Sequence, residues 1–299
     1  MGNIKIGMIG LDTSHAVAFT KLLNDPNNPF HVTGGQVMIA CPVGSLDFEL
    51  SYSRINGITK EVEQYGVQIV QTIEEVAEQC DAILVESVDG RVHLEQLQKM
   101  VMFNKPIFID KPFCLCSSDA AEMVKLSEKY NTPIMSSSAL RFAEALSRSL
   151  TIQDKGNIIG ADCFGPMEMV ETQPGYFWYG IHTIEMLYAI LGRGAKNVQT
   201  VSNQDYDLII SQWEDGRIGT ARGNRKGNHN FGAVIHYENG NEYVVIDSSS
   251  KPYYASLLEQ IILFFSEGKQ SVPVTETQEI IRFIEAANDS KVTGKQIWI

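Results

Sequence analysis

Residues 4–15, IKIGMIGLDTSH, decide the fold of this chain. The mostly apolar run from Ile4 to Ile9 predicts a buried strand, and the stretch from Ser14 to Leu23 predicts a helix that ends at turn residues. Gly10 lies between them, where the chain must turn sharply. A strand, a glycine turn and a helix in this order form the start of a βαβ unit, so we expect a parallel sheet.

The same alternation continues through the first third of the chain. Further strands are predicted at residues 36–40, 67–70, 82–85 and 106–109, and helices at 60–65, 73–79 and 92–103. Thr72 and Glu75 form a capping-box pattern at the start of helix 73–79. Strands separated by helices pair in parallel through crossovers, which predicts a Rossmann-like, doubly wound α/β domain over residues 1–118. Ligands of such sheets bind at the carboxyl ends of the strands.

After about residue 118 the pattern changes. Helix 118–130 and strand 133–136 lead into longer strands, and helices 256–267 and 275–288 close the chain. Asp215-Gly216 separates strands 208–213 and 217–222, and Asn239-Gly240 separates strands 233–237 and 242–246. Both dipeptides favour tight hairpin turns. Residues 119–299 are therefore predicted to form an α+β domain with a largely antiparallel sheet.

Composition excludes several classes of protein. The chain has 299 residues, a net charge of −12, 44% hydrophobic residues and 20% charged residues, which is typical of a globular protein. The acidic balance and the lack of a basic patch argue against nucleic-acid and membrane partners. No apolar run reaches the ~20 residues that span a bilayer, and the start MGNIKI lacks a secretion signal. We expect a cytoplasmic location, with the five scattered cysteines reduced.

The glycine turn departs from the dinucleotide-binding pattern G-x-G-x-x-G. Of the three glycines only the first, Gly10, is present. Asp12 stands at the second glycine position and His15 at the third. The carboxylate of Asp12 would repel a pyrophosphate, although the amides of Ser14 and His15 at the helix start could still hold a phosphate. Strand 36–40 ends at Cys41-Pro42 without an acidic ribose partner, so the choice between NAD and NADP stays open.

Several motifs occur together in a characteristic order. Residues 104–113, NKPIFIDKPF, end a strand on Asp110-Lys111-Pro112, and residues 180–187 read GIHTIEML. The series is completed by NTPI at residues 131–134, ALRF at residues 139–142 and SKVTGK at residues 290–295. With these motifs the sequence resembles the Gfo/Idh/MocA family of oxidoreductases nearly from end to end. The resemblance implies an NAD- or NADP-dependent dehydrogenase of small sugars, inositols or related hydroxy compounds, assembled as a homodimer or homotetramer through the C-terminal sheet.

The resemblance also implies catalytic residues. The ammonium of Lys111, at a strand's carboxyl end, can stabilise negative charge on a substrate oxygen. His182 can transfer the hydroxyl proton, with Glu185 on the same helix face to orient the ring. Many family members carry an acid–base Asp four residues before this histidine, where this chain has Trp178. Either His182 or Tyr179 must then take that role, or the usual chemistry is lost; a neighbouring Lys111 would lower the pKa of Tyr179. Surface, interface and packing roles are the structural alternatives.

Further residues fall where the family contacts its cofactor. Glu86 and Asp89 follow strand 82–85, and Asp110 and Lys111 follow strand 106–109. With Gly10, Asp12, Ser14 and His15 they form the predicted cofactor-binding set. No metal site is expected, because His182 and Glu185 alone offer too few ligands.

Two other functions remain open at this point. A non-redox relative would retain NAD as a helper in eliminating or hydrolysing a glycosidic bond, as the loss of the acid–base Asp at Trp178 suggests. A binding or sensor protein would have kept the fold and lost the nucleotide, as Asp12, His15 and Pro42 suggest.

Overall fold

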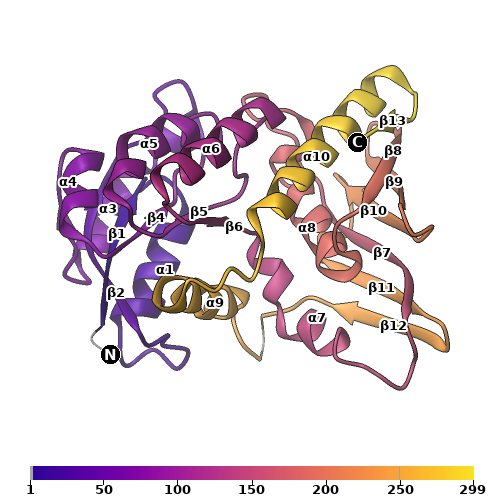
Figure 1. Ribbon diagram of the computed structural model, residues 1–299, viewed down its shortest axis with the longest axis horizontal. Coiled ribbons are helices and arrows are strands. Elements are labelled where there is room, and N and C mark those ends of the chain that lie inside the picture. Colours follow the sequence, from indigo (N-terminus) through magenta and orange to yellow (C-terminus); the bar gives the residue numbers. More distant parts are fainter. Residues whose placement is uncertain (1–2, 249) are drawn as a thin grey trace. The chain divides into compact units, whose positions relative to one another are not determined.

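The computed structural model describes residues 3–248 and 250–299, which form two compact units (Figure 1). The first unit holds the described residues up to Cys114, Ser118–Ser137 and Tyr254–Val274. The second holds Leu115–Ser117, Ser138–Tyr253 and Thr275–Ile299. This division differs from the single boundary predicted at residue 118, because residues 118–137 and 254–274 pack with the first unit. None of the described helices has both the length and the apolar character needed to cross a membrane.

The first unit contains the predicted doubly wound sheet. Its six parallel strands have the order β3-β2-β1-β4-β5-β6, with bounds β1 Ile4–Ile9, β2 Gly35–Cys41, β3 Gln68–Ile69, β4 Ala82–Val85, β5 Ile107–Ile109 and β6 Ile134–Ser136. The helices are α1 Ser14–Asn24, α2 Glu49–Tyr52, α3 Ile55–Glu63, α4 Ile73–Gln79, α5 His93–Met100, α6 Ser117–Tyr130 and α9 Tyr253–Glu267. The short η1 Val101–Phe103 follows α5 as a separate 3-10 turn, so the predicted helix 92–103 is divided.

Helices cover both faces of this sheet. A Cβ at Gly7 of β1 would lie 2.4 Å from Val76 of α4, and one at Gly35 of β2 would lie 2.8 Å from Ile262 of α9 and 2.6 Å from Ile6. Because Ile6 and Gly7 are adjacent strand residues, they point to opposite faces. The helices α4 and α9 therefore lie on opposite faces, as a doubly wound fold requires.

Two local predictions have clear outcomes. The capping box at α4 is confirmed, because the Glu75 amide donates to Thr72 Oγ1 at 3.2 Å and the Thr72 amide donates to the Glu75 carboxylate at 3.0 Å. The helix predicted at residues 60–65 begins earlier, as α3 starts at Ile55. Its buried residues Ile58 and Val62 are four apart, so the apolar face extends one turn further toward the N-terminus than the prediction placed it.

The second unit contains a seven-stranded mixed sheet of order β12-β11-β7-β10-β9-β8-β13. Its strands are β7 Ile158–Pro166, β8 Ala195–Ser202, β9 Tyr206–Trp213, β10 Ile218–Asn224, β11 Gly232–Tyr237, β12 Gly240–Val245 and β13 Ile297–Trp298. Only β7 and β10 pair in parallel, and both predicted hairpins are present. The other elements are η2 Ala139–Phe142, α7 Glu144–Ser149, η3 Gly175–Phe177, α8 Gly180–Leu191 and α10 Val274–Thr293.

The register of the parallel sheet positions the candidate site. Ile9 of β1 pairs with Val85 of β4, which pairs with Ile109 of β5. The next residues along these strands, Gly10, Glu86 and Asp110, therefore lie side by side at the carboxyl edge.

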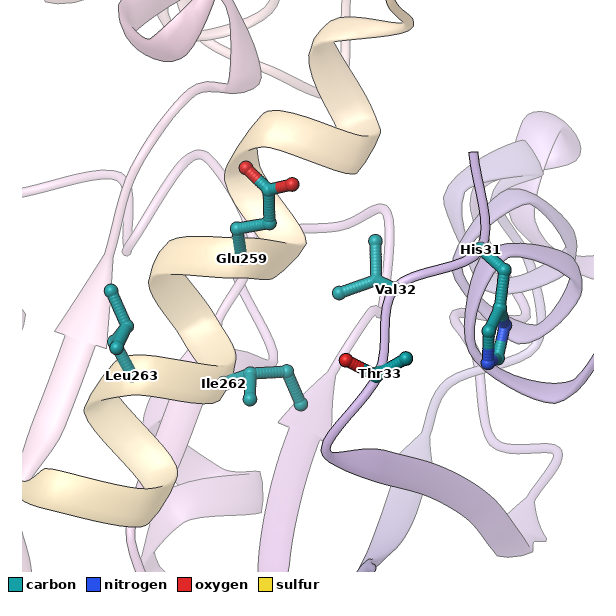
Figure 2. Close-up of a pocket in the computed structure, with 6 residues that line it drawn as sticks. All are labelled: His31, Val32, Thr33, Glu259, Ile262 and Leu263. Atoms are coloured by element: carbon teal, nitrogen blue, oxygen red, sulfur yellow. The ribbon is translucent and has the colours of Figure 1, made fainter. Parts of the chain in front are cut away.

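A separate pocket of about 330 Å³ lies at the opposite end of the strands (Figure 2). It is lined by His31, Val32, Thr33, Glu259, Ile262 and Leu263, which come from the segment before β2 and from α9. Because residues 31–33 precede β2, this pocket belongs to the amino-terminal edge of the sheet. Ligands of doubly wound sheets bind at the carboxyl edge, so the pocket is not part of the candidate site.

Candidate active site at the carboxyl edge

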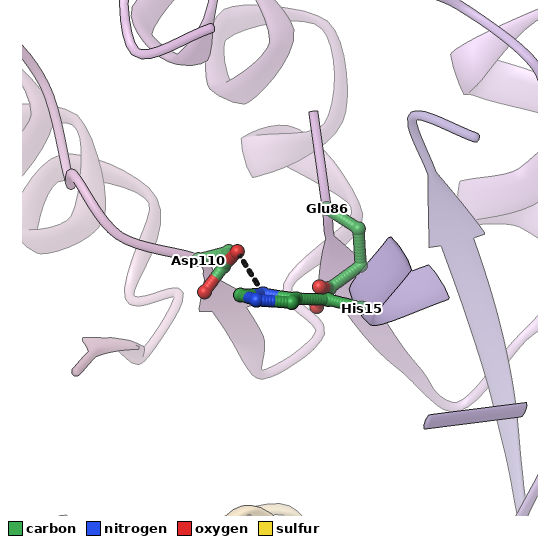
Figure 3. Close-up of side chains that lie close together, drawn as sticks. All are labelled: His15, Glu86 and Asp110. Atoms are coloured by element: carbon green, nitrogen blue, oxygen red, sulfur yellow. Dashed lines mark hydrogen bonds and ion pairs between the residues drawn. The ribbon is translucent and has the colours of Figure 1, made fainter. Parts of the chain in front are cut away.

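His15, Glu86 and Asp110 form a buried cluster where β1, β4 and β5 end (Figure 3). His15 Nδ1 and Asp110 Oδ2 are 2.6 Å apart, and one ligand atom from each of the three residues lies within 4.8 Å of the others. Glu86 is 0% exposed, and neither carboxylate oxygen has a hydrogen-bond partner among the described residues. The cluster thus combines a hydrogen-bonded imidazole–carboxylate pair with a second carboxylate that has unused acceptors.

Rigid elements hold these three side chains in place. The Glu86 amide donates to the Ile9 carbonyl at 2.7 Å, and the Asp110 amide donates to the Val85 carbonyl at 2.8 Å. His15 lies in the first turn of α1, where Thr13 is the N-cap. Its ring stacks on Phe19, with centroids 5.9 Å apart, and contacts Tyr254, with centroids 4.8 Å apart. The backbone ladder and the aromatic contacts therefore fix both carboxylates and the imidazole.

The two acids of the cluster have opposite electrostatic environments. Burial raises the pKa of Glu86 well above its ordinary value, and the nearby Asp110 carboxylate raises it further. Burial acts in the same direction on Asp110, but the His15 imidazole and the Lys111 ammonium outweigh it and hold the pKa of Asp110 below its ordinary value. This separation of pKa values between neighbouring acids is typical of functional sites.

Asp12 occupies the second glycine position and is fully buried. Its carboxylate accepts hydrogen bonds from the Val88 amide at 3.0 Å and from Ser51 Oγ at 2.5 Å. Burial raises the pKa of Asp12, and these hydrogen bonds oppose that effect. The side chain thus joins the β1–α1 loop to the segment after β4 and to α2, a role that the sequence did not reveal.

The surroundings of Gly10 fit a dinucleotide only in part. Gly10 has φ +88°, and a Cβ there would lie 2.4 Å from the Ser87 amide, so the close turn of a dinucleotide-binding sheet is present. The buried side chains of Asp12 and His15 take the places of the later glycines, whereas Ser14 is exposed at the start of α1. The strand order and the first turn fit a dinucleotide, but the usual glycine cradle for the pyrophosphate is absent from this described loop.

Asp89 has an internal role in the structure. It is fully buried and accepts hydrogen bonds from Ser45 Oγ at 2.6 Å and from the Arg91 guanidinium at 2.7 Å. Arg91 also pairs with Asp47 at 2.9 Å. These contacts tie the loop after β4 to the loop after β2, so Asp89 shapes the edge of the site.

Lys111 follows Asp110 directly and is half-buried in the first unit. The Lys111–Pro112 peptide bond is cis. Because β5 ends at Ile109, the lysine lies at the carboxyl edge, which is the position that the sequence predicted.

The second unit holds the other two predicted catalytic residues. His182 lies in the first turn of α8, and its Nδ1 is 2.7 Å from Ser138 Oγ. The Tyr179 ring meets the His182 ring edge to face, with centroids 5.8 Å apart. Both side chains are half-buried and Trp178 is their neighbour.

Two expectations about these residues are wrong. Glu185 does not orient His182, because it is buried and its carboxylate pairs with Arg141 Nε at 2.9 Å, while Arg141 also pairs with Glu276. The pKa of Tyr179 is raised, first by burial and then by Glu168, and not lowered. A phenol that loses hydration on burial favours its neutral form.

The strand order of the first sheet and the Gly10 turn are those of a dinucleotide-binding type of α/β fold. Residues 4–137 match the family model described as "Oxidoreductase family, NAD-binding Rossmann fold", that of Gfo/Idh/MocA. The match covers the first unit's parallel-sheet region and ends before the second sheet.

Solved structures of the same fold extend over the whole chain. GenD2 from gentamicin A biosynthesis, in complex with NAD, has 12% identity and a TM-score of 0.81, with 100% of this chain and 97% of that chain covered. Myo-inositol dehydrogenase from Lactobacillus casei, with NAD(H) and myo-inositol, has 14% identity and a TM-score of 0.77, with 100% and 97% covered. Myo-inositol 2-dehydrogenase from Lactobacillus plantarum has 16% identity and a TM-score of 0.78, with both chains covered fully at 100%. At this identity the likeness establishes the fold. A search of curated protein sequences found no match.

Proposed function

We propose that this protein is an NAD- or NADP-dependent dehydrogenase of a small sugar, inositol or related hydroxy compound. The observation that carries the proposal is the oxidoreductase family match over residues 4–137, a range that contains β5 and the Asp110-Lys111 pair directly after it. Similar folds that bind NAD(H) and myo-inositol support the substrate class and favour redox chemistry over the non-redox and sensor alternatives.

Lys111 would act on the substrate oxygen. Its ammonium would donate a hydrogen bond to that oxygen and stabilise the negative charge that grows as the hydroxyl proton leaves, before the hydride is lost from carbon. A bound nicotinamide ring would supply the hydride acceptor. The turn at Gly10 and the backbone amide of Ser14 at the start of α1 would hold the dinucleotide. The remaining requirement is a group that takes the hydroxyl proton.

His182 is the better candidate for that proton transfer. An imidazole exchanges protons near neutral pH, and Ser138 Oγ at 2.7 Å fixes the orientation of the ring. Burial keeps Tyr179 protonated, so the phenol is a poor base and is better suited to donate a hydrogen bond or pack against substrate. The indole N–H of Trp178 is neither an acid nor a base near neutral pH, which leaves His182 in the acid–base role.

A nucleotide titration tests this function. We would follow the melting temperature and the heat of binding of the purified protein with NAD+, NADH, NADP+ and NADPH. A ligand at 100 times its Kd stabilises the native state by about 2.7 kcal/mol, so one nucleotide of the four should raise the melting temperature. When inositols or sugars are then added with the oxidised nucleotide, the absorbance of the reduced nicotinamide should increase. No shift and no heat with any nucleotide would reject the proposal, and a cofactor that cycles without accumulating in reduced form would favour the non-redox alternative.

The outer face of the second sheet supports assembly as a homodimer or homotetramer. Gly219 of β10 faces α8, since a Cβ there would lie 2.8 Å from Leu187, so the neighbouring Ile218 faces the other way. That face also carries exposed Tyr243 and Val245 of β12. Exposed apolar side chains on an open sheet face favour association between copies of a chain. A cytoplasmic location remains a prediction.

A further inference from the structure

We propose that His15, Glu86 and Asp110 bind one divalent transition-metal ion, of the Mn²⁺ or Zn²⁺ type, at the carboxyl edge of the parallel sheet. This site goes beyond the proposed dehydrogenase function and does not depend on it. The sequence predicts no metal site, with His182 and Glu185 as the only ligands considered. His15, Glu86 and Asp110 come from three separate segments that the strand register brings together.

The first argument is the unused acceptor capacity of Glu86. Both of its oxygens are buried and have no hydrogen-bond partner in the part of the chain that the structure describes, and the carboxylate points into the space beside His15 (Figure 3). An isolated buried carboxylate costs several kcal/mol of free energy, so such groups take up a proton, pair with a cation or bind a metal. A divalent cation would supply the missing partner and neutralise Glu86 and Asp110 together.

The second argument is the donor set. One imidazole nitrogen and two carboxylates, with ligand atoms within 4.8 Å of one another, match the ligands of Mn²⁺, Fe²⁺ and Zn²⁺. Calcium requires six to eight oxygen ligands and is disfavoured by the imidazole. Ion binding would replace the 2.6 Å contact between His15 Nδ1 and Asp110 Oδ2 by two metal bonds, and three protein ligands leave positions for water or substrate.

The third argument is the support around the ligands. Glu86 and Asp110 sit on backbone that is fixed by hydrogen bonds to Ile9 and Val85, and Phe19 and Tyr254 hold the His15 ring. Metal sites on rigid elements need little rearrangement on binding. An ion there would also lie at the same carboxyl edge of the sheet as Lys111.

Calorimetric titration of chelator-treated protein with MnCl2 and ZnCl2 tests the site, with no nucleotide or substrate present. We expect one ion per chain and a higher melting temperature with the ion. Glu86→Gln keeps the shape of the side chain and removes its charge, so it should weaken binding at least about tenfold, the lower bound seen for residues that only support a ligand. Asp110→Asn is a second variant with the same expectation.

The matched control is His236→Gln. His236 Nε2 pairs with Asp162 Oδ2 at 2.8 Å in the second unit, so it is also a histidine–carboxylate pair, but no third ligand joins it among the described residues. This variant should bind the ion as the natural protein does. The site is refuted if the natural protein binds no ion, or if Glu86→Gln and Asp110→Asn both bind it undiminished. Nucleotide binding without metal binding would reject the site and leave the proposed function intact.

Discussion

Lys111 is the residue on which the proposed chemistry depends. Replacing Lys111 by Met removes the ammonium but keeps an unbranched side chain, so kcat should fall by about 10²–10³-fold, as on loss of one oxyanion donor. The control is Lys99→Met, since Lys99 pairs only with Glu95 on the exposed surface of α5 among its described contacts. Steady-state rates of both variants measure the effect. A fully active Lys111→Met enzyme would remove Lys111 from the mechanism.

The pair of His236 and Asp162 makes a pH-dependent contribution to stability. The hydrogen bond to Asp162 is the largest cause that raises the pKa of His236 above 6.5. A histidine with a raised folded-state pKa stabilises the protein below the unfolded value and loses that contribution as pH rises through the folded value. The pair is partly exposed, so the contribution should be no more than about 1 kcal/mol. In urea unfolding, the His236→Gln variant should be as stable as the natural protein well above pH 6.5 and less stable below it. Equal stability of the two proteins at both pH extremes would contradict the prediction.

The candidate site was only partly predictable at the residue scale. Lys111 and Asp110 follow a recognisable strand, and His182 has a recognisable helical context, so their positions were expected. The partners of Asp12 and Glu185 were not, because Ser51 and Arg141 lie 39 and 44 residues away. Burial also reversed the expected pKa shift of Tyr179. Side-chain partners depend on which segments meet, and local sequence does not specify this.

At the scale of elements, the turn from β1 to α1 depends on Gly10. Its positive φ costs an L-residue about 1–2 kcal/mol, and an added methyl would also meet the Ser87 amide at 2.4 Å. Gly66 has a similar φ, +81°, but open space around it. Gly10→Ala should therefore destabilise the protein by at least about 1 kcal/mol more than Gly66→Ala, since overpacking adds to the backbone cost. Urea unfolding of both variants measures the difference, and equal losses would show that the close approach to Ser87 is unimportant.

Element prediction succeeded where local patterns are strong. The strands around residues 4–9 and 82–85 and both hairpins were found because apolar runs and Gly turns are local signals. The strands β7 and β8 were not predicted. Buried and exposed residues do not alternate regularly along either strand. Pairing with β10 and β9, and not their own periodicity, therefore defines these two strands.

For the whole molecule, the outer face of the second sheet predicts self-association. Tyr243 is 65% exposed on β12 and lies on that face. In a self-complementary interface each introduced charge appears on both subunits, so two like charges meet there and repel each other. Tyr243→Glu should therefore dissociate the oligomer. Leu46→Glu is the control, because Leu46 is 88% exposed in the first unit. Light scattering should give an oligomer for the natural protein and Leu46→Glu, and a monomer for Tyr243→Glu. A monomeric natural protein would contradict the prediction.

The sequence by itself determined the two kinds of sheet, most of their elements, the match of residues 4–137 to an oxidoreductase family and the position of Lys111. These properties follow from periodicity, turn residues and short motifs, each of which acts over a few neighbouring residues. Only the tertiary structure decided that His15 meets Asp110, 95 residues away, beside Glu86. The physical reason is strand register: pairing Ile9 with Val85 and Val85 with Ile109 places the residues that follow them at one edge, where burial removes the water that would otherwise solvate their charges.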